Sequence, residues 1–291
     1  MKVQLHENNW TVLIEDLDLK KATVEQAHEI ARLLTTNTVV VVRDQDLSPQ
    51  DEVDFCSKIG KVESFKGRKE EAEKNQMFEI TSKLTGFLVP ETDDQVIRVT
   101  GEKDELGRPG LFGHVSDLDW HCNQAANPWR DPIVWLYGVK GTAGSRTSWI
   151  NTILCYDDLS EDKKDEYDEI QTVNAYKAGG YSPDFFYKEV DINYHWNPNI
   201  VQTNVAGKTG LFFPFLQMHE VVGMTEEESR NFIIEVRDHL LQDKYMYHHD
   251  WRDGDVVISE QWLGLHKRWK FEDIENRVLH RICFNFDNVD F

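Results

Sequence analysis

The feature that most constrains the fold is a series of short apolar runs in the second half of the chain. They are rich in β-branched and aromatic residues and lie at 132–139, 147–153, 245–249, 255–259 and 279–286. Runs of this length and composition are typical of buried strands. A hairpin is also expected within 200–216, where Gly207 and Gly210 flank a turn. We therefore predict a mainly β fold with peripheral helices (α+β), arranged as a double-stranded β-helix or jelly-roll barrel.

Helices are expected only around this core. Thr23-x-x-Gln26 and Thr225-x-x-Glu228 are capping-box patterns, in which two side chains satisfy backbone N–H groups of the first turn. Ser48 followed by Pro49 is an N-cap with proline at the first helical position. These patterns predict helices over 24–34, 49–59 and beyond 225, and the acidic segment 159–172 predicts one more.

The first half adds expected strands at 12–17, 38–42 and 96–100. Two irregular segments, 61–95 and the aromatic 176–197, are candidate lids or substrate walls, since long irregular connections are often functional. No internal repeat or low-complexity segment divides the chain, so 1–291 is predicted to be a single domain. No glycine-rich turn has the dinucleotide or P-loop spacing, so a Rossmann-type reading has no support.

The formal net charge of −20 argues against nucleic acid as a partner, because phosphate backbones would be repelled. The four cysteines form no CxxC pattern and are expected to be free thiols in a reducing compartment. No signal-peptide pattern opens the sequence, and no apolar stretch approaches the roughly 20 residues of a membrane span. These features predict a cytoplasmic protein whose partners are small molecules, with no membrane.

The chemistry is concentrated in Trp120-His121-Cys122-Asn123 and in a distant His266, followed by arginines. A His-x-acid pair, a far-downstream histidine and a basic residue is the order expected of a non-haem iron oxygenase. In such sites two histidines and one carboxylate bind one face of Fe(II) and leave the other face open. Here Asn123 stands where the acid is expected.

Five short segments, taken in order, carry a resemblance to a known family. They are Arg43-Asp44-Gln45 with Leu47-Ser48-Pro49 ahead of a helix ending at Gly60, the segment Trp120-His121-Cys122-Asn123, the segment Gly144-Ser145-Arg146-Thr147-Ser148-Trp149, the block from Gly254-Asp255 through Glu260-Gln261 to His266, and finally Arg277 and Arg281. The two arginines follow His266 at the family spacing. Over most of its length the chain resembles the taurine dioxygenase (TauD/TfdA-like) branch of the Fe(II)/2-oxoglutarate-dependent oxygenases.

The resemblance implies that His121, Asn123 and His266 hold the metal. Three alternatives stay open for Asn123: its amide oxygen coordinates the metal, it stands off and leaves room for water or an anion, or the site is catalytically impaired. Asp117 and Asp119 precede the motif at strand spacing, which predicts that both lie on the side of His121. They could bind a cationic substrate group, or one could replace the missing carboxylate. The alternative is that they are solvated loop acids.

The resemblance also implies that 2-oxoglutarate and O2 are co-substrates. Arg277 would clamp the distal carboxylate of 2-oxoglutarate, with Thr147 as a hydroxyl donor, because a planar guanidinium matches a carboxylate. Arg281 would share this role or reach an acidic group of the substrate. Arg281, Arg98 and the two aspartates suggest a small, charged, amino-acid-like substrate.

The implied reaction is oxidative decarboxylation of 2-oxoglutarate to succinate and CO2, coupled to hydroxylation of an unactivated C–H bond. The alternatives are a halogenase or another oxidase that diverts the rebound step, and a metal-impaired protein that binds 2-oxoglutarate without turnover. Members of the family are often dimers or tetramers, so a homo-oligomer is a further expectation. A zinc hydrolase has little support, because no third strong ligand stands at zinc-enzyme spacing.

Overall fold

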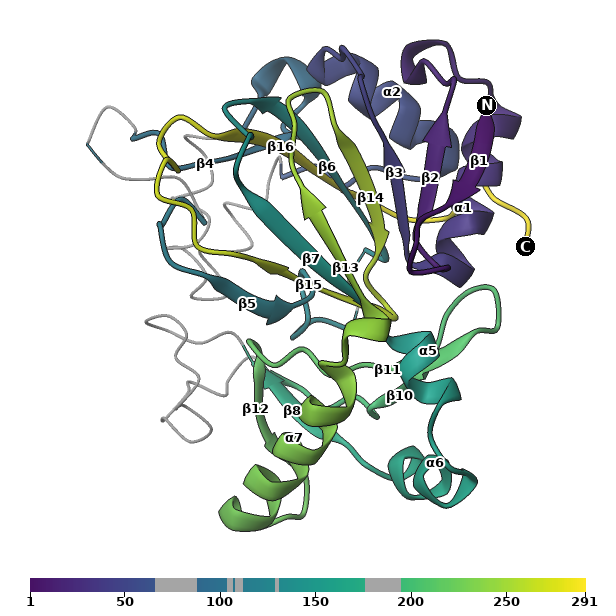
Figure 1. The fold of residues 1–291 in the computed structure, drawn as a ribbon, viewed down its shortest axis with the longest axis vertical. Coiled ribbons are helices and arrows are strands. Elements are labelled where there is room, and N and C mark those ends of the chain that lie inside the picture. The colour runs from purple at the N-terminus through teal and green to yellow at the C-terminus, as the bar shows by residue number, and fades with distance from the viewer. Residues whose placement is uncertain (66–87, 104–106, 108–111, 129–130, 176–194) are drawn as a thin grey trace.

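Two facing β-sheets form the body of the protein (Figure 1). The computed structural model describes residues 1–65, 88–103, 107, 112–128, 131–175 and 195–291. The larger sheet has the spatial order β1 (Lys2–Leu5), β2 (Val12–Glu15), β3 (Val39–Val42), β14 (Val256–Glu260), β6 (Ile133–Lys140), β16 (Val278–Phe284) and β4 (Ile97–Thr100). The smaller sheet has the order β13 (Met246–Asp250), β7 (Arg146–Asn151), β15 (Gly264–Arg268) and β5 (Leu118–His121). Apart from the parallel β2–β3 pair, these strands are antiparallel, which confirms the predicted jelly roll.

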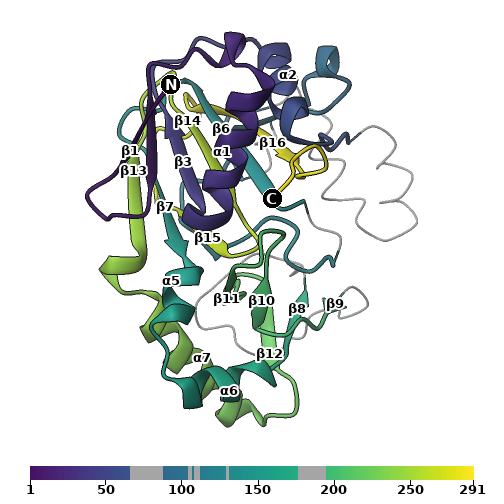
Figure 2. The same ribbon diagram turned by 90° about the vertical axis from the view of Figure 1, so that its right-hand side faces the viewer.

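The central strands β3, β14 and β6 of the larger sheet are buried on both faces, which explains why they show no alternation of polar and apolar residues. In β3, Val40 and Val42 pack towards the helices, whereas Val39 and Val41 pack into the barrel with Trp149 from the smaller sheet. Helices α1 (Val24–Asn37) and α2 (Pro49–Ile59) cover the outer face (Figures 1 and 2). The space between the two sheets is therefore the barrel interior.

The capping patterns identified in the sequence are formed. Thr23 and Gln26 make a reciprocal capping box, as do Ser48 with Asp51. Helix α2 has the predicted bounds, whereas α1 runs three residues past the predicted end. Thr38 ends α1 in a left-handed conformation with φ 56°, and its N–H bonds to the carbonyl of Leu34.

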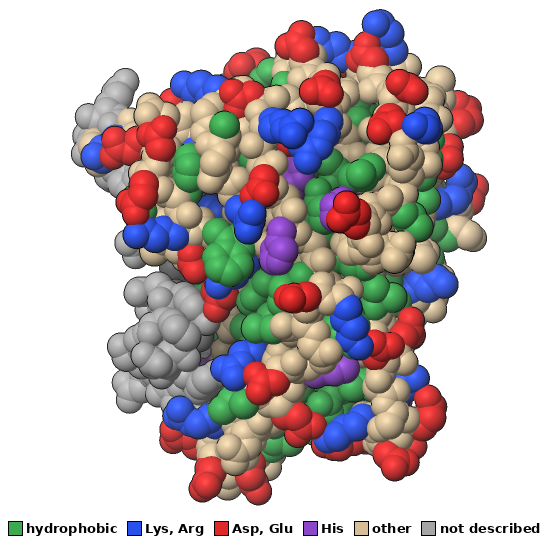
Figure 3. Space-filling model, in the orientation of Figure 1, with side chains coloured by type: hydrophobic (Ala, Val, Ile, Leu, Met, Phe, Trp, Pro, Cys, Tyr) green, Lys and Arg blue, Asp and Glu red, His purple; other side chains and the backbone are tan. Residues whose placement is uncertain are grey.

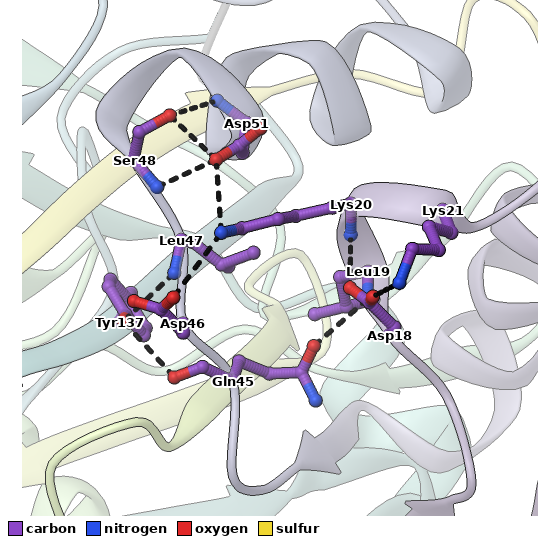
Figure 4. A network of polar contacts seen from close by, with 10 residues as sticks. All are labelled: Asp18, Leu19, Lys20, Lys21, Gln45, Asp46, Leu47, Ser48, Asp51 and Tyr137. Atoms are coloured by element: carbon purple, nitrogen blue, oxygen red, sulfur yellow. Dashed lines mark hydrogen bonds and ion pairs between the residues drawn. The ribbon is translucent and has the colours of Figure 1, made fainter.

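The connection from β3 to α2 is tied to the sheet by a polar network (Figure 4). The N–H of Leu47 donates to the hydroxyl of Tyr137 on β6, and this hydroxyl donates to the carbonyl of Gln45, both at 3.2 Å. The side chain of Gln45 in turn accepts from the N–H of Leu19 in the 3-10 helix η1 (Leu19–Lys21). This network fixes how the N-terminal block meets the barrel.

A smaller lobe lies beyond the end of the smaller sheet (Figures 1 and 2). It contains α5 (Thr152–Asp157), α6 (Glu161–Asp168), α7 (Glu226–Leu240) and the short strands β8 (Thr172–Ala175), β9 (His195–Trp196), β10 (Val201–Thr203), β11 (Thr209–Leu211) and β12 (Met218–Val221). Strands β10 and β11 form the predicted hairpin. The predicted helix 159–172 is shorter than expected, because Thr172 already starts β8 and pairs with Val221. Helix α5 was not predicted.

Most of the two candidate lids, 66–87 and 176–194, lies outside the described residues. The described ends of these segments are anchored: Val62 bridges to Phe284, the 3-10 helix η2 spans Pro90–Thr92, and β9 pairs with β8. A third 3-10 helix, η3 (Asp243–Tyr245), precedes β13.

The cysteines, the charged surface residues and the helices can each be compared with the sequence expectations. All four cysteines are buried free thiols, as predicted. Acidic and basic side chains are interspersed over the face shown in Figure 3. Within the described part of the chain, no helix has the length and apolar character needed to cross a membrane.

Candidate active site

The structure brings the two motif histidines together inside the barrel. His121 on β5 and His266 on β15 are direct cross-strand partners, and their ring centroids lie 4.1 Å apart. Trp149 on β7 is the partner of His266 on the other side and stacks on its ring at 6.5 Å. Both imidazoles therefore lie on the inner face of the smaller sheet, although 145 positions separate them in sequence.

Both imidazoles are prepared to act as neutral ligands. The Nδ1 of His121 lies 2.6 Å from the carbonyl oxygen of Asp119, which fixes the proton on Nδ1 and leaves the Nε2 lone pair for a metal. Burial lowers the pKa of His121 to about 4, against the raising effect of that carbonyl. Burial, followed by the charges of His121 and Arg281, lowers the pKa of His266 well below its usual range. No proton competes with a metal for either ring at neutral pH.

Asn123 follows His121 by two residues and is 8% exposed. Its backbone N–H donates to Gln261 at 2.7 Å, and Gln261 donates to the carbonyl of Asp131, so the backbone is held by a side chain next to β14. The Nδ2 of Asn123 is buried and has no hydrogen-bond partner. Two neutral imidazoles and an amide oxygen suit Fe(II), with a weaker third donor than a carboxylate. In the described part of the chain, no three His, Cys, Asp or Glu side chains are placed to hold one metal ion.

A β-bulge in β5 overturns the expectation that Asp117 and Asp119 lie on the side of His121. His121 pairs with His266 and Leu118 pairs with Arg268, so two residues of β5 lie opposite Lys267 alone. The alternation is broken, and both aspartates instead contact the ammonium of Lys267, at 3.4 Å and 3.1 Å. The extra residue could not be seen in the sequence spacing. Cys122 is buried in the apolar cluster that also contains Trp120, on the outer face of the smaller sheet.

Arg277 and Thr147, the predicted 2-oxoglutarate ligands, are both buried in one region. The Nε of Arg277 donates to the hydroxyl of Ser145 at 3.0 Å, two residues before Thr147, and its Nη1 is buried without a partner. The hydroxyl oxygen of Thr147 accepts from Trp251 at 2.9 Å, so its proton is directed elsewhere. Burial, with a further effect of Arg268, lowers the pKa of Arg277 to about 9, which still leaves it charged at neutral pH. A buried cation with an unused donor suits a carboxylate.

Arg281 also faces the barrel interior, because it alternates with Leu279 and Cys283 of the interior core. Its positive charge lowers the pKa of both histidines, and its guanidinium lies 5.6 Å from the ring centroid of Phe112. Arg98, by contrast, pairs with His280 on the opposite face of β16 and forms an ion pair with Glu102. The structure therefore does not bring Arg98 to the histidines.

Sequence reasoning missed Arg268, a third arginine on the inner face. It lies two residues past His266, is 5% exposed and is the cross-strand partner of Thr147 on β7. Its guanidinium donates to the carbonyls of Phe112, His114 and Ser116 at 2.5–2.8 Å, which fixes the segment before β5. The spacing of two residues from His266 was the signal that could have indicated it.

Glu260, the last residue of β14, stabilises the turn that leads into β15. Its carboxylate accepts from the backbone N–H groups of Trp262 and Leu263 at 3.1 Å and 2.8 Å. These two hydrogen bonds fix the turn that leads into β15, the strand that carries His266.

Comparison with known proteins agrees with this geometry. A model of the family described as "Taurine catabolism dioxygenase TauD, TfdA family" matches residues 7–283. The chain is 23% identical over 274 residues to an alpha-ketoglutarate-dependent 2,4-dichlorophenoxyacetate dioxygenase of Cupriavidus pinatubonensis, covering 92% of each chain. It is 22% identical over 222 residues to a pentalenolactone F synthase of Streptomyces arenae, covering 70% of this chain and 73% of the relative.

Solved structures show the same fold. A taurine dioxygenase from Burkholderia xenovorans superimposes with a TM-score of 0.71 at 18% identity, over 97% of this chain and 90% of the other. AAD-2, solved in complex with Mn(II) and N-oxalylglycine, superimposes with a TM-score of 0.73 at 16% identity, over 98% of this chain and 96% of the other.

Proposed function

Because this chain belongs to the TauD/TfdA family of dioxygenases, we propose that it hydroxylates an unactivated C–H bond of a small acidic molecule. Fe(II), 2-oxoglutarate and O2 are the cofactor and co-substrates of the family, and curated relatives are alpha-ketoglutarate-dependent dioxygenases. The observation that carries the proposal is the pair of neutral, facing imidazoles of His121 and His266 on the inner face that also carries Arg281, in a barrel that buries Arg277.

Each residue of the site has a part in this reaction. Fe(II), when bound, would supply the oxidation of 2-oxoglutarate and substrate. His121 and His266 would hold it, with the amide oxygen of Asn123 as the third ligand. Arg277 and Thr147 hold the distal carboxylate of 2-oxoglutarate, which fixes the keto-acid end towards the histidines. The buried apolar core around Trp149 excludes bulk water.

The substrate class follows from the charges that remain. Asp117 and Asp119 form ion pairs with Lys267, and Arg98 forms an ion pair with Glu102 on the outer face. Of the four candidate substrate residues, Arg281 alone faces the interior, so the site favours a carboxylate or similar acid over a cationic or amino-acid-like group. The 2,4-dichlorophenoxyacetate acted on by one relative is an acid of this kind.

Succinate formation from 2-oxoglutarate tests the proposal. It should require Fe(II), rise when a panel of small carboxylic acids is added, and be lost in His266→Ala. The matched control is His248→Ala, which changes an exposed histidine on neighbouring β13. A protein that binds 2-oxoglutarate but forms no succinate with saturating iron would be the metal-impaired alternative, which the neutral Asn123 favours. A chlorinated product that requires chloride would indicate a halogenase.

A further inference from the structure

Among the described residues, no Asp or Glu joins the two histidines in a group that could hold a metal ion, whereas three arginines lie on this side of the barrel. Arg268, Arg277 and Arg281 contribute three buried or half-buried guanidinium groups, and Nε of Arg268, Nη1 of Arg277 and Nε of Arg281 lack partners. The two histidines are neutral, and Nδ2 of Asn123 is a fourth buried N–H donor without a hydrogen-bond partner among the described residues. The bulge in β5 directs the nearby aspartates to Lys267.

This arrangement opposes a divalent cation that arrives alone. Arg281 faces the same interior as the two imidazoles, and its positive charge would oppose a divalent cation held there by Coulomb repulsion. With a carboxylate at position 123, one negative charge in direct contact would offset that repulsion. With an amide, this position supplies no charge, and an anion bound beside the metal would supply it instead.

We propose that, because Asn123 carries no charge, the barrel holds its metal ion tightly only when the dianion 2-oxoglutarate is bound as well. The inference rests on the proposed function, and it adds that the two ligands bind as one cooperative unit. The dianion supplies the negative charge that the third ligand position lacks, and it occupies the unpartnered donor of Arg277. By thermodynamic linkage, the metal raises the affinity for the dianion by the same factor.

Asn123→Asp is a clean test of this inference. The backbone of residue 123 is positioned by its N–H bond to Gln261, which does not involve the side chain that changes. The substitution therefore adds one charge with little change of shape. Asn231→Asp on α7 is the charge-matched control, because it makes the same exchange at an exposed position of the smaller lobe.

Calorimetric titration with Mn(II), which is not oxidised during the measurement, gives the coupling directly. The dissociation constant for Mn(II) is measured without and with saturating 2-oxoglutarate. The ratio of the two should be at least about tenfold larger in the parent protein and in Asn231→Asp than in Asn123→Asp. Most of the difference should arise without 2-oxoglutarate, where Asn123→Asp binds Mn(II) more tightly. A parallel titration with chloride in place of 2-oxoglutarate should give a much smaller ratio.

A second variant covers the case in which Asn123→Asp does not fold. Arg281→Met removes the opposing charge and should likewise tighten Mn(II) binding in the absence of 2-oxoglutarate. Equal ratios in the parent protein and Asn123→Asp would overturn the inference, as would chloride acting as strongly as 2-oxoglutarate. In both cases 2-oxoglutarate still binds, and the proposed function stands. If 2-oxoglutarate does not bind even with saturating Mn(II), the proposed function fails and the inference fails with it.

Discussion

Replacing Arg277 by methionine should make the ligand-free protein more stable. Burial lowers the pKa of this guanidinium from 12.5 to about 9, so at neutral pH it stays charged in both states and the fold disfavours that charge. At about 1.4 kcal/mol per pKa unit, the penalty is on the order of 5 kcal/mol. Methionine keeps much of the apolar stem but loses the bond to Ser145, which is worth about 1 kcal/mol. The net stabilisation should be about 4 kcal/mol.

The assay is thermal unfolding with and without 2-oxoglutarate and Mn(II). For a chain of this size, about 4 kcal/mol corresponds to a rise of roughly 5 °C or more in Tm without ligand. The parent protein should gain about 2.7 kcal/mol when 2-oxoglutarate is present at a hundred times its dissociation constant, whereas Arg277→Met should gain little. The difference in Tm between Arg277→Met and the parent should therefore shrink by about half or more when ligand is added.

Arg146→Met is the matched control, because Arg146 is exposed and pairs with Asp250 on the surface. Its Tm should change by less than about 2 °C, since exposed ion pairs contribute 1 kcal/mol or less. A ligand-free Arg277→Met that is less stable than the parent would refute the reasoning, because it would mean that the protein itself compensates the buried charge.

Three other outcomes are expected. His266→Ala should show no Mn(II) binding heat with 2-oxoglutarate present, and retained binding would exclude this imidazole as a ligand. Glu260→Gln should lower the free energy of unfolding in urea by about 1–2 kcal/mol, because an amide oxygen replaces a carboxylate that accepts two backbone N–H groups; unchanged midpoints would contradict this. Burial raises the pKa of Asp255, but its interactions with His249 and Arg43 outweigh this and hold the pKa below 3.8. The stability that the ionised carboxylate contributes is therefore present above pH 3.8 and is lost as the pH falls further. Asp255→Asn should therefore lose less stability than the parent between about pH 5 and pH 3, and parallel acid curves would count against it.

Local signals in the sequence predicted much of the fold. The capping box at Thr23 and the N-cap at Ser48 located α1 and α2, because a helix start depends on a few adjacent side chains. The β-branched run 38–42 was recognisable as a buried strand, which the structure places at Val39–Val42. The end of the acidic helix was misplaced, because the strand β8 that follows depends on a partner, β12, that lies far along the chain.

The candidate site was predictable where the sequence segments resemble those of the family. His121 and His266 meet as expected from their motifs, and Arg277, Thr147 and Arg281 are buried or face the interior. The aspartates before His121 could not be placed correctly, because a bulge depends on cross-strand register and has no pattern of its own here. Arg98 was misjudged for a related reason, since which face of β4 is internal is decided by its pairing with β16.

The bulge in β5 also reverses which positions can be engineered. Upstream of it, the residue across from Arg268 is Leu118, so this side chain and not Asp119 has access to the inner face. An acid introduced as Leu118→Asp would meet a guanidinium whose hydrogen bonds to described residues go to main-chain oxygens and one histidine ring. The neighbouring acid is one position away in sequence, yet it belongs to the opposite surface of the sheet. A substitution at Asp119, chosen by the two-residue alternation of a regular strand, would change the exterior of the barrel and leave the polarity of its interior unchanged.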